Sequence, residues 1–296
     1  MGKRACTYCG AVAKLSREHM IPRWLHSYLP PVSDTTSVVA FTNGKDGVEK
    51  IESGNAYQQT IRNVCRKCNS GWMSTLQNEV RDVVIDLVGG ECQSLTTAQQ
   101  LAVSRWLAMT AISVQHQGLK KGNHLKRVCS KQTYTWDPTA LRSIVVGDHP
   151  PLGWTIWIGR TSEAVQRPLV SFNFPMPVPP MVPNSVASPK EIVVSGTLIC
   201  LGSLLALVCG TPNWHSARWW NPSSANAKYQ ARLWPISERI LNVPCEAVFG
   251  QQESWKLVNE FCKFWYEGHK PPPPFHRFLT NEEIVAANDA VLSCLG

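Results

Sequence analysis

Two stretches of this chain, Cys6-Thr7-Tyr8-Cys9 and Cys65-Arg66-Lys67-Cys68, share the spacing CxxC and decide how the N-terminal region folds. A tight CxxC turn directs two thiolates at one point, and two such turns supply the four sulfurs of a tetrahedral structural zinc site. We therefore predict a structural zinc ion bound by Cys6, Cys9, Cys65 and Cys68. Because the ion would close a long loop, folding of this region is expected to depend on zinc.

Three further residues lie beside these knuckles and are not needed for zinc. Glu18 and His19 follow the first pair, and Asn69 directly follows the second. If zinc joins the knuckles, a carboxylate, an imidazole and an amide come close together. Mg²⁺ takes oxygen ligands of this kind together with water and substrate phosphate, and a neutral histidine can take a proton from attacking water. These residue types indicate phosphodiester hydrolysis.

These residues resemble the HNH nucleases of the ββα-metal (His-Me) finger type. The resemblance is carried by Cys6-x-x-Cys9, by Glu18-His19-Met20-Ile21-Pro22 and by Cys65-x-x-Cys68-Asn69. It implies that His19 is the general base, that Glu18 and Asn69 hold a catalytic Mg²⁺ or Mn²⁺, and that the four cysteines bind zinc. It also implies a metal-dependent endonuclease acting on DNA, in a setting such as bacterial or phage defence.

The chain departs from the family's pattern between the knuckles. Thr60 stands where the family has a middle asparagine, and Asn63 is taken as the residue that steadies the loop. The acidic position is Glu18 rather than the commoner aspartate, and the stretch between the knuckles is longer than usual. The alternative is a non-catalytic zinc ribbon that binds nucleic acid, in which His19 only packs.

Length and composition limit the possible fold classes. The chain has 296 residues, of which 44 % are hydrophobic and 17 % charged, so it is globular and long enough for two domains. We predict an α+β fold, with a zinc-stapled ββα-metal module over residues 1–82 and a mixed helical and antiparallel β domain over 83–296. The net charge of +8 fits a polyanionic partner but does not identify one.

The number and spacing of cysteines and the N-terminal sequence indicate the cellular compartment of the protein. The eleven cysteines are an odd number with CxxC spacing, and no apolar segment follows the basic start, so we expect a cytoplasmic protein. Residues 192–210 carry no charge and approach the length of a membrane span. Interspersed Gly and Ser favour two buried strands, 197–201 and 204–209, over a membrane anchor. The expected partner is DNA, without a membrane, and a partner protein or a homo-oligomer is left open.

Periodicity predicts the remaining elements. A helical stripe begins after Asn69, and a second helix begins at Thr96, whose capping-box partner is Gln99, and ends near Gly118. Strands are expected at 56–64, 153–159 and 169–174, a hairpin or loop at 30–54, and helices at 254–266 and after Thr280. The basic run 120–131 and Trp219-Trp220 are open to nucleic-acid contact, although solvated or buried side chains are the simpler interpretation.

Overall fold

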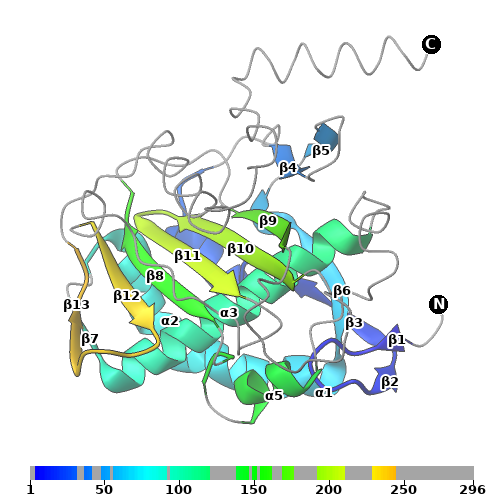
Figure 1. Ribbon diagram of the computed structural model, residues 1–296, viewed down its shortest axis with the longest axis horizontal. Helices are drawn as coiled ribbons and strands as arrows, with labels where there is room; N and C mark the ends of the chain where they lie inside the picture. The colour runs from blue at the N-terminus through cyan, green and yellow to red at the C-terminus, as the bar shows by residue number, and fades with distance from the viewer. Residues whose placement is uncertain are drawn as a thin grey trace.

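The computed structural model describes residues 4–31, 37–41, 48–53, 56–91, 94–120, 138–146, 149–151, 154–161, 169–176, 192–210 and 229–244. Within these residues the chain is an α+β protein whose strands all pair antiparallel, which confirms the predicted class. A central sheet lies against the helices α2 (Ser74–Gly89) and α3 (Thr97–Lys120) (Figure 1).

The N-terminal region consists of short strands around the two knuckles. Strands β1 (Arg4–Ala5) and β2 (Val12–Ala13) flank the first knuckle, and β3 (Leu15–His19) pairs with β6 (Thr60–Cys65). The 3₁₀ helix η1 (Arg23–Tyr28) follows β3. Between them lie the hairpin β4 (Ser37–Phe41) and β5 (Val48–Ser53) and the 3₁₀ turn η2 (Ala56–Gln58). The predicted hairpin at 30–54 is confirmed, and the strand predicted at 56–64 is shorter than expected.

Strand β6 continues directly into a kinked helix. The first turn is α1 (Arg66–Cys68), followed by the wide π-type turn η3 (Asn69–Met73) and then by α2. Gly71 departs from helical geometry, with φ −97° and ψ −117°, and marks the kink. Strand β3 pairs with β6, and β6 runs directly into this helix. Two paired strands and a helix therefore surround the second knuckle.

Helix α2 buries the apolar stripe that its sequence predicts. Its buried side chains recur at spacings of three and four, which places them on one face; they are Leu76, Val80, Val83, Val84, Leu87 and Val88. The helix ends at Gly90, which takes the left-handed conformation with φ +79°. The amide of Gly90 donates to the Leu87 carbonyl and that of Glu91 to the Asp86 carbonyl, a glycine-based helix stop.

Five strands form the central sheet, in the order β12-β8-β11-β10-β9. They are β8 (Thr155–Arg160), β9 (Leu169–Met176), β10 (Ile192–Leu201), β11 (Leu204–Gly210) and β12 (Gln230–Trp234). A small pair, β7 (Ser94–Thr96) with β13 (Ile240–Asn242), and the short helix α5 (Pro138–Val145) complete the described elements. The strands predicted at 153–159 and 169–174 are confirmed.

Helix α3 crosses one face of this sheet and contacts each of its five strands (Figure 1). The start of α3 has the predicted capping box: the amide of Thr96 donates to Gln99 Oε1 at 2.9 Å, and the amide of Gln99 donates to Thr96 Oγ1 at 3.4 Å. Fully buried Trp106 and Leu107 on this helix join the core shared with Ile156 of the sheet. Each side chain of this size stabilises the fold by roughly 1.5–3 kcal/mol through burial.

The uncharged stretch 192–210 forms the hairpin of β10 and β11, which confirms the prediction of two strands. Residues 196–201 and 204–209 are buried, and because consecutive strand residues point in opposite directions, both faces of this hairpin are covered. Among the residues that the structure describes, no helix combines the length and the apolar character needed to span a membrane.

The turn of this hairpin docks on the end of α2. Gly202 has φ +55°, and the Ser203 amide donates to the Val88 carbonyl oxygen at 2.7 Å. A Cβ added at Gly202 would lie 2.5 Å from that same oxygen. Only glycine satisfies both the backbone conformation and this close approach.

We expect Gly202→Ala to lower the free energy of unfolding by about 2–4 kcal/mol, because left-handed strain and displacement of Val88 add together. Gly10→Ala is the matched control: Gly10 also has positive φ, +70°, but a Cβ there would meet no atom within 4 Å. Denaturant unfolding should show a loss of only about 1–2 kcal/mol for the control. Equal losses in the two variants would contradict the close approach.

The predicted boundary between residues 82 and 83 lies inside α2, which runs without a break from Ser74 to Gly89. Buried side chains from both sides of the boundary belong to one hydrophobic cluster, including Tyr8 and Leu25 before it and Trp106 after it. Two separately folding units therefore stay a prediction. The helices predicted at 254–266 and after Thr280, Trp219-Trp220, and the basic run beyond Lys120 lie outside the described residues.

Candidate functional site

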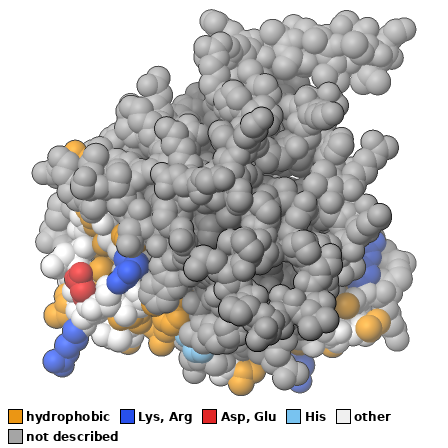
Figure 2. Space-filling view, viewed as in Figure 1, with side chains coloured by type: hydrophobic (Ala, Val, Ile, Leu, Met, Phe, Trp, Pro, Cys, Tyr) orange, Lys and Arg blue, Asp and Glu red, His pale blue; other side chains and the backbone are white. Residues whose placement is uncertain are grey.

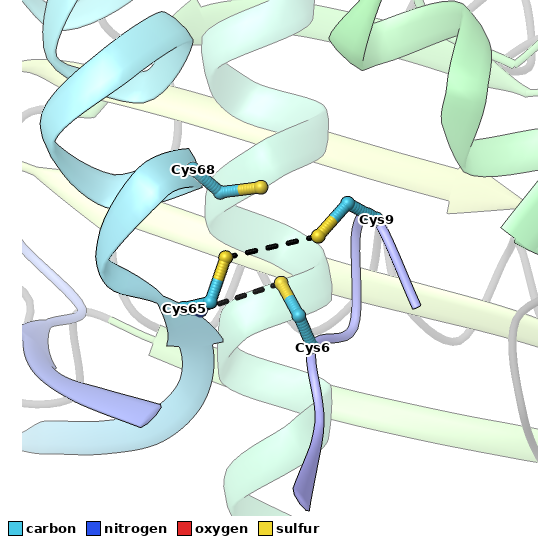
Figure 3. Close-up of side chains that lie close together, drawn as sticks. All are labelled: Cys6, Cys9, Cys65 and Cys68. Atoms are coloured by element: carbon cyan, nitrogen blue, oxygen red, sulfur yellow. Dashed lines mark hydrogen bonds between the residues drawn. The ribbon is translucent and has the colours of Figure 1, made fainter. Parts of the chain in front are cut away.

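The two knuckles meet as predicted and bring the four cysteines together (Figure 3). Their Sγ atoms all lie within 4.8 Å of one another, with Cys9 and Cys65 3.7 Å apart. The backbone amide of Cys65 donates to Cys6 Sγ at 3.3 Å. Three of the cysteines are buried and Cys9 is exposed.

This geometry fits a tetrahedral zinc ion. Zinc–sulfur bonds of about 2.3 Å at tetrahedral angles separate two sulfurs by about 3.8 Å, close to the distance between Cys9 and Cys65. A disulfide needs about 2.05 Å, and all four cysteines are free thiols. Burial raises the pKa of Cys68, and the nearby indole N–H of Trp72 offsets part of this effect. Four crowded thiolates need a cation, so the cluster can bind a metal such as zinc.

Tyr8, inside the first knuckle, anchors this centre to α3. Its side chain is 1 % exposed, and its hydroxyl donates to the Met109 carbonyl oxygen at 3.0 Å. Its ring packs edge-on against Trp72 with the centroids 5.2 Å apart. Burial raises the pKa of Tyr8 well above its usual value, so the hydroxyl stays protonated and can donate. The first knuckle, with Cys6 and Cys9, is therefore attached to the central core rather than to a free loop.

We expect Tyr8→Phe to lower the free energy of unfolding by about 1 kcal/mol, because the buried bond to the Met109 carbonyl and the 3.5 Å contact with Ser113 Oγ are lost while the ring packing is kept. Tyr28→Phe is the control, since the Tyr28 side chain is 48 % exposed and its loss of a hydroxyl should be nearly neutral. Chemical denaturation of the zinc-loaded proteins measures both values. Equal stability of Tyr8→Phe and the native chain would contradict the anchoring role.

Glu18 and Asn69 come together on the helix side of the β3–β6 hairpin. The Asn69 amide nitrogen donates to Ser16 Oγ at 3.3 Å, and Asn69 also hydrogen-bonds to the Glu18 carboxylate. A second hydrogen bond reaches Glu18 from Gln77. Burial raises the pKa of the Glu18 carboxyl, and these two amide hydrogen bonds offset part of the rise. The kink at Gly71 lies between Asn69 and Gln77, which both reach Glu18.

His19 lies next to Glu18 in sequence, but its ring has different neighbours. Arg23 Nε donates to His19 Nε2 at 2.8 Å, and the ring of His26 lies edge-on with the centroids 5.8 Å apart. Nδ1 is buried near the Tyr57 backbone without a hydrogen bond of ordinary geometry. Burial holds the pKa of His19 below its usual value, and the positive charge of Arg23 lowers it further. The ring is therefore neutral near pH 7.

The predicted site residues thus fall into three groups. Glu18 and Asn69 are in contact, whereas His19 forms no hydrogen bond to either of them among the described residues. Asn63 lies on β6 with its side chain 3 % exposed and its amide atoms without a hydrogen-bond partner among the described residues. Its backbone carbonyl accepts from the Thr7 amide at 2.9 Å, so Asn63 connects β6 to the first knuckle through the main chain.

Two contacts of Glu18 and Asn69 were not predicted from the sequence. Ser16 precedes Glu18 by two positions and so faces the same side of the strand, a signal that strand alternation supplies. Gln77 lies about two helical turns after Asn69. Whether two side chains at this spacing share one face depends on the exact geometry of the helix. The kink at Gly71 alters that geometry and hides the pairing from sequence.

On the face seen in Figure 2, the lysine and arginine side chains of the described residues lie apart from one another. The described residues on that face therefore form no extended basic patch.

Comparisons of this chain with protein-family models, with curated proteins and with solved structures found no match.

Proposed function

We propose that this protein is a metal-dependent endonuclease that hydrolyses phosphodiester bonds of DNA by HNH-type chemistry. One observation carries the proposal: the four cysteines bring the first knuckle to the start of the helix, and β3 pairs with β6, so that Glu18 contacts Asn69, with His19 at the next position of the strand. Glu18 is a partly buried carboxylate that meets two amides, and the next residue, His19, has a lowered pKa. Perturbed titratable groups of this kind concentrate at functional sites.

The residues present fit a hard divalent cation. Glu18 offers a carboxylate, and Asn69 and Gln77 offer amide oxygens, while Mg²⁺ takes one or two carboxylates and completes its shell with water and substrate phosphate. In this proposal Glu18 and Asn69 hold Mg²⁺ or Mn²⁺, and Gln77 orients the Glu18 carboxylate. A divalent ion bound there supplies charge stabilisation to the phosphodiester. The zinc of the four cysteines has a structural role only.

His19 acts as the general base in this proposal. Because Arg23 Nε donates to Nε2, that nitrogen carries the lone pair, and in the neutral ring the proton is on Nδ1. Nε2 therefore takes the proton of the attacking water. The lowered pKa of His19 keeps the ring neutral near pH 7, the protonation state that a base requires.

A non-catalytic zinc ribbon that binds nucleic acid is the second candidate. It is favoured by the hydrogen bonds that Asn69 and Gln77 already give to Glu18, which partner the carboxylate without a metal. Incubation of the zinc-loaded protein with plasmid DNA in Mg²⁺ or Mn²⁺ separates the two candidates. Cleavage that depends on both His19 and Glu18 supports the nuclease, and binding without cleavage supports the ribbon.

A further inference from the structure

Two exposed arginines flank His19: Arg17 lies on β3, and Arg23 is the first residue of η1. Arg17 Nε donates to Thr60 Oγ1 at 2.7 Å, and Thr60 is the cross-strand partner of His19. On the other side, Arg23 Nε donates to His19 Nε2 at 2.8 Å. Both guanidinium groups therefore lie next to the imidazole, and both side chains are exposed.

The charge of these two arginines is not neutralised by the described part of the chain. Each uses its Nε–H in the bonds above, and neither forms an ion pair or another hydrogen bond with a described residue. A guanidinium has five N–H donors, so each arginine retains four. The acidic residue of the β3–β6 hairpin, Glu18, is partly buried and bonded to amides of the helix. Arg17 and Arg23 thus offer forked donors for an anion with planar or tetrahedral oxygens.

We propose that Arg17 and Arg23 bind backbone phosphates of duplex DNA on either side of His19, an inference that rests on the proposed nuclease function and deepens it. A two-stranded hairpin can lie against a groove of B-form DNA, where phosphate contacts fix the register of the protein. Arg17 and Arg23 would then fix the position of the scissile phosphate relative to His19 Nε2.

The bond between Arg23 and His19 links phosphate binding by Arg23 to the availability of the His19 Nε2 lone pair. Arginine does not lose its proton in proteins, so Nε2 of His19 is always the acceptor in that bond. While the bond persists, the lone pair needed for proton transfer is occupied. A phosphate that draws the Arg23 guanidinium toward its own oxygens frees Nε2 at the moment the substrate is in place. Arg23 is thus a positioning residue that links substrate binding to release of the base.

The salt dependence of DNA binding tests the phosphate contacts. Zinc-loaded protein without added Mg²⁺ or Mn²⁺ is titrated with a fluorescent DNA duplex at several salt concentrations. We expect Arg17→Ala and Arg23→Ala each to reduce the slope of log K against log salt by about one, as loss of one phosphate contact does. Arg239→Ala is the matched control, because Arg239 is exposed and directly precedes β13 (Ile240–Asn242), a strand that Figure 1 draws at the opposite end of the molecule from β3 and β6.

Lysine replacements keep this test independent of folding. Arg17→Lys and Arg23→Lys retain the positive charge and should retain the slope of the native chain, while zinc content and thermal melting identify any variant that fails to fold. Slopes for both alanine variants equal to those of the native chain and Arg239→Ala would overturn the proposal. Tighter binding to single-stranded RNA than to duplex DNA would overturn the choice of ligand.

Cleavage kinetics separate this inference from the proposed function. If the native protein cuts DNA, Arg23→Ala should raise KM about tenfold or more with little loss of kcat, because a phosphate contact is lost but the base is free. A large fall in kcat at unchanged KM would contradict the release of His19 by Arg23. Altered salt slopes without any cleavage would contradict the nuclease proposal and support the phosphate contacts of Arg17 and Arg23. Cleavage with unaltered salt slopes would support the nuclease and contradict these phosphate contacts.

Discussion

His19→Ala should reduce DNA cleavage by about 10²–10⁴-fold, the range expected when a general base is removed. The reason is local: Nε2 is the lone pair that the structure offers beside Glu18, and alanine leaves no group to take the proton of the attacking water. Conversion of supercoiled plasmid to nicked and linear forms in Mg²⁺ or Mn²⁺ measures the loss. Glu18→Gln should cause a comparable loss, because the amide keeps the shape of the side chain but removes the charge that holds a divalent ion.

Glu79→Gln provides the matched control for Glu18→Gln. Glu79 is exposed on α2, close in sequence to Gln77, and its side chain forms no hydrogen bond or ion pair with a described residue. Its loss should leave cleavage unchanged. Activity that survives in both His19→Ala and Glu18→Gln would rule out this site. A native protein that cleaves neither DNA nor RNA in either metal would rule out the nuclease and leave the zinc ribbon.

Removal of zinc should unfold the N-terminal region. Structural zinc contributes about 10–16 kcal/mol in small zinc modules, which equals or exceeds the whole stability of an ordinary domain. Cys65→Ser and Cys68→Ser should each lose the bound zinc and expose β6 to proteolysis. Because Tyr8 joins the first knuckle to α3, the thermal transition of the remaining described core should also shift downward.

Cys200→Ser is the control for zinc loss. Cys200 lies in the central sheet, 3 % exposed, and burial raises its pKa to about 12, so it is a poor metal ligand. This variant should keep one zinc per chain, measured by metal analysis of the purified protein. A full zinc equivalent in Cys65→Ser, or a melting curve that does not respond to a chelator, would contradict the structural role of the cluster.

Features set by local spacing were predictable from the sequence. The CxxC pairs, the capping box of Thr96 with Gln99 and the division of 192–210 into two strands each follow from residues a few positions apart. The meeting of Glu18 with Asn69 was also predictable, because two CxxC turns that converge on one point fix which distant segments meet. These predictions succeeded because geometry or chemistry leaves few alternatives at those positions.

Long-range packing was not predictable in the same way. The hydroxyl of Tyr8 bonds to Met109, 101 residues away, and nothing in either residue type specifies the other. The bond between Arg23 and His19 spans four residues, but it depends on the 3₁₀ turn after Pro22, which no pattern in the sequence predicts. The order of strands in the sheet likewise depends on tertiary packing, since β12 joins β8 across a long intervening stretch. Non-local contacts of this kind lie beyond local patterns.

The exposure of Cys9 separates the affinity of the metal centre from its rate of exchange. All four sulfurs would contribute to the affinity for zinc, but Cys6, Cys65 and Cys68 are buried residues and Cys9 is exposed. We expect chelators, competing metal ions and oxidants to act first at Cys9. The rate at which the cluster would gain or lose an ion then depends on the first knuckle, while its equilibrium affinity would depend on all four cysteines.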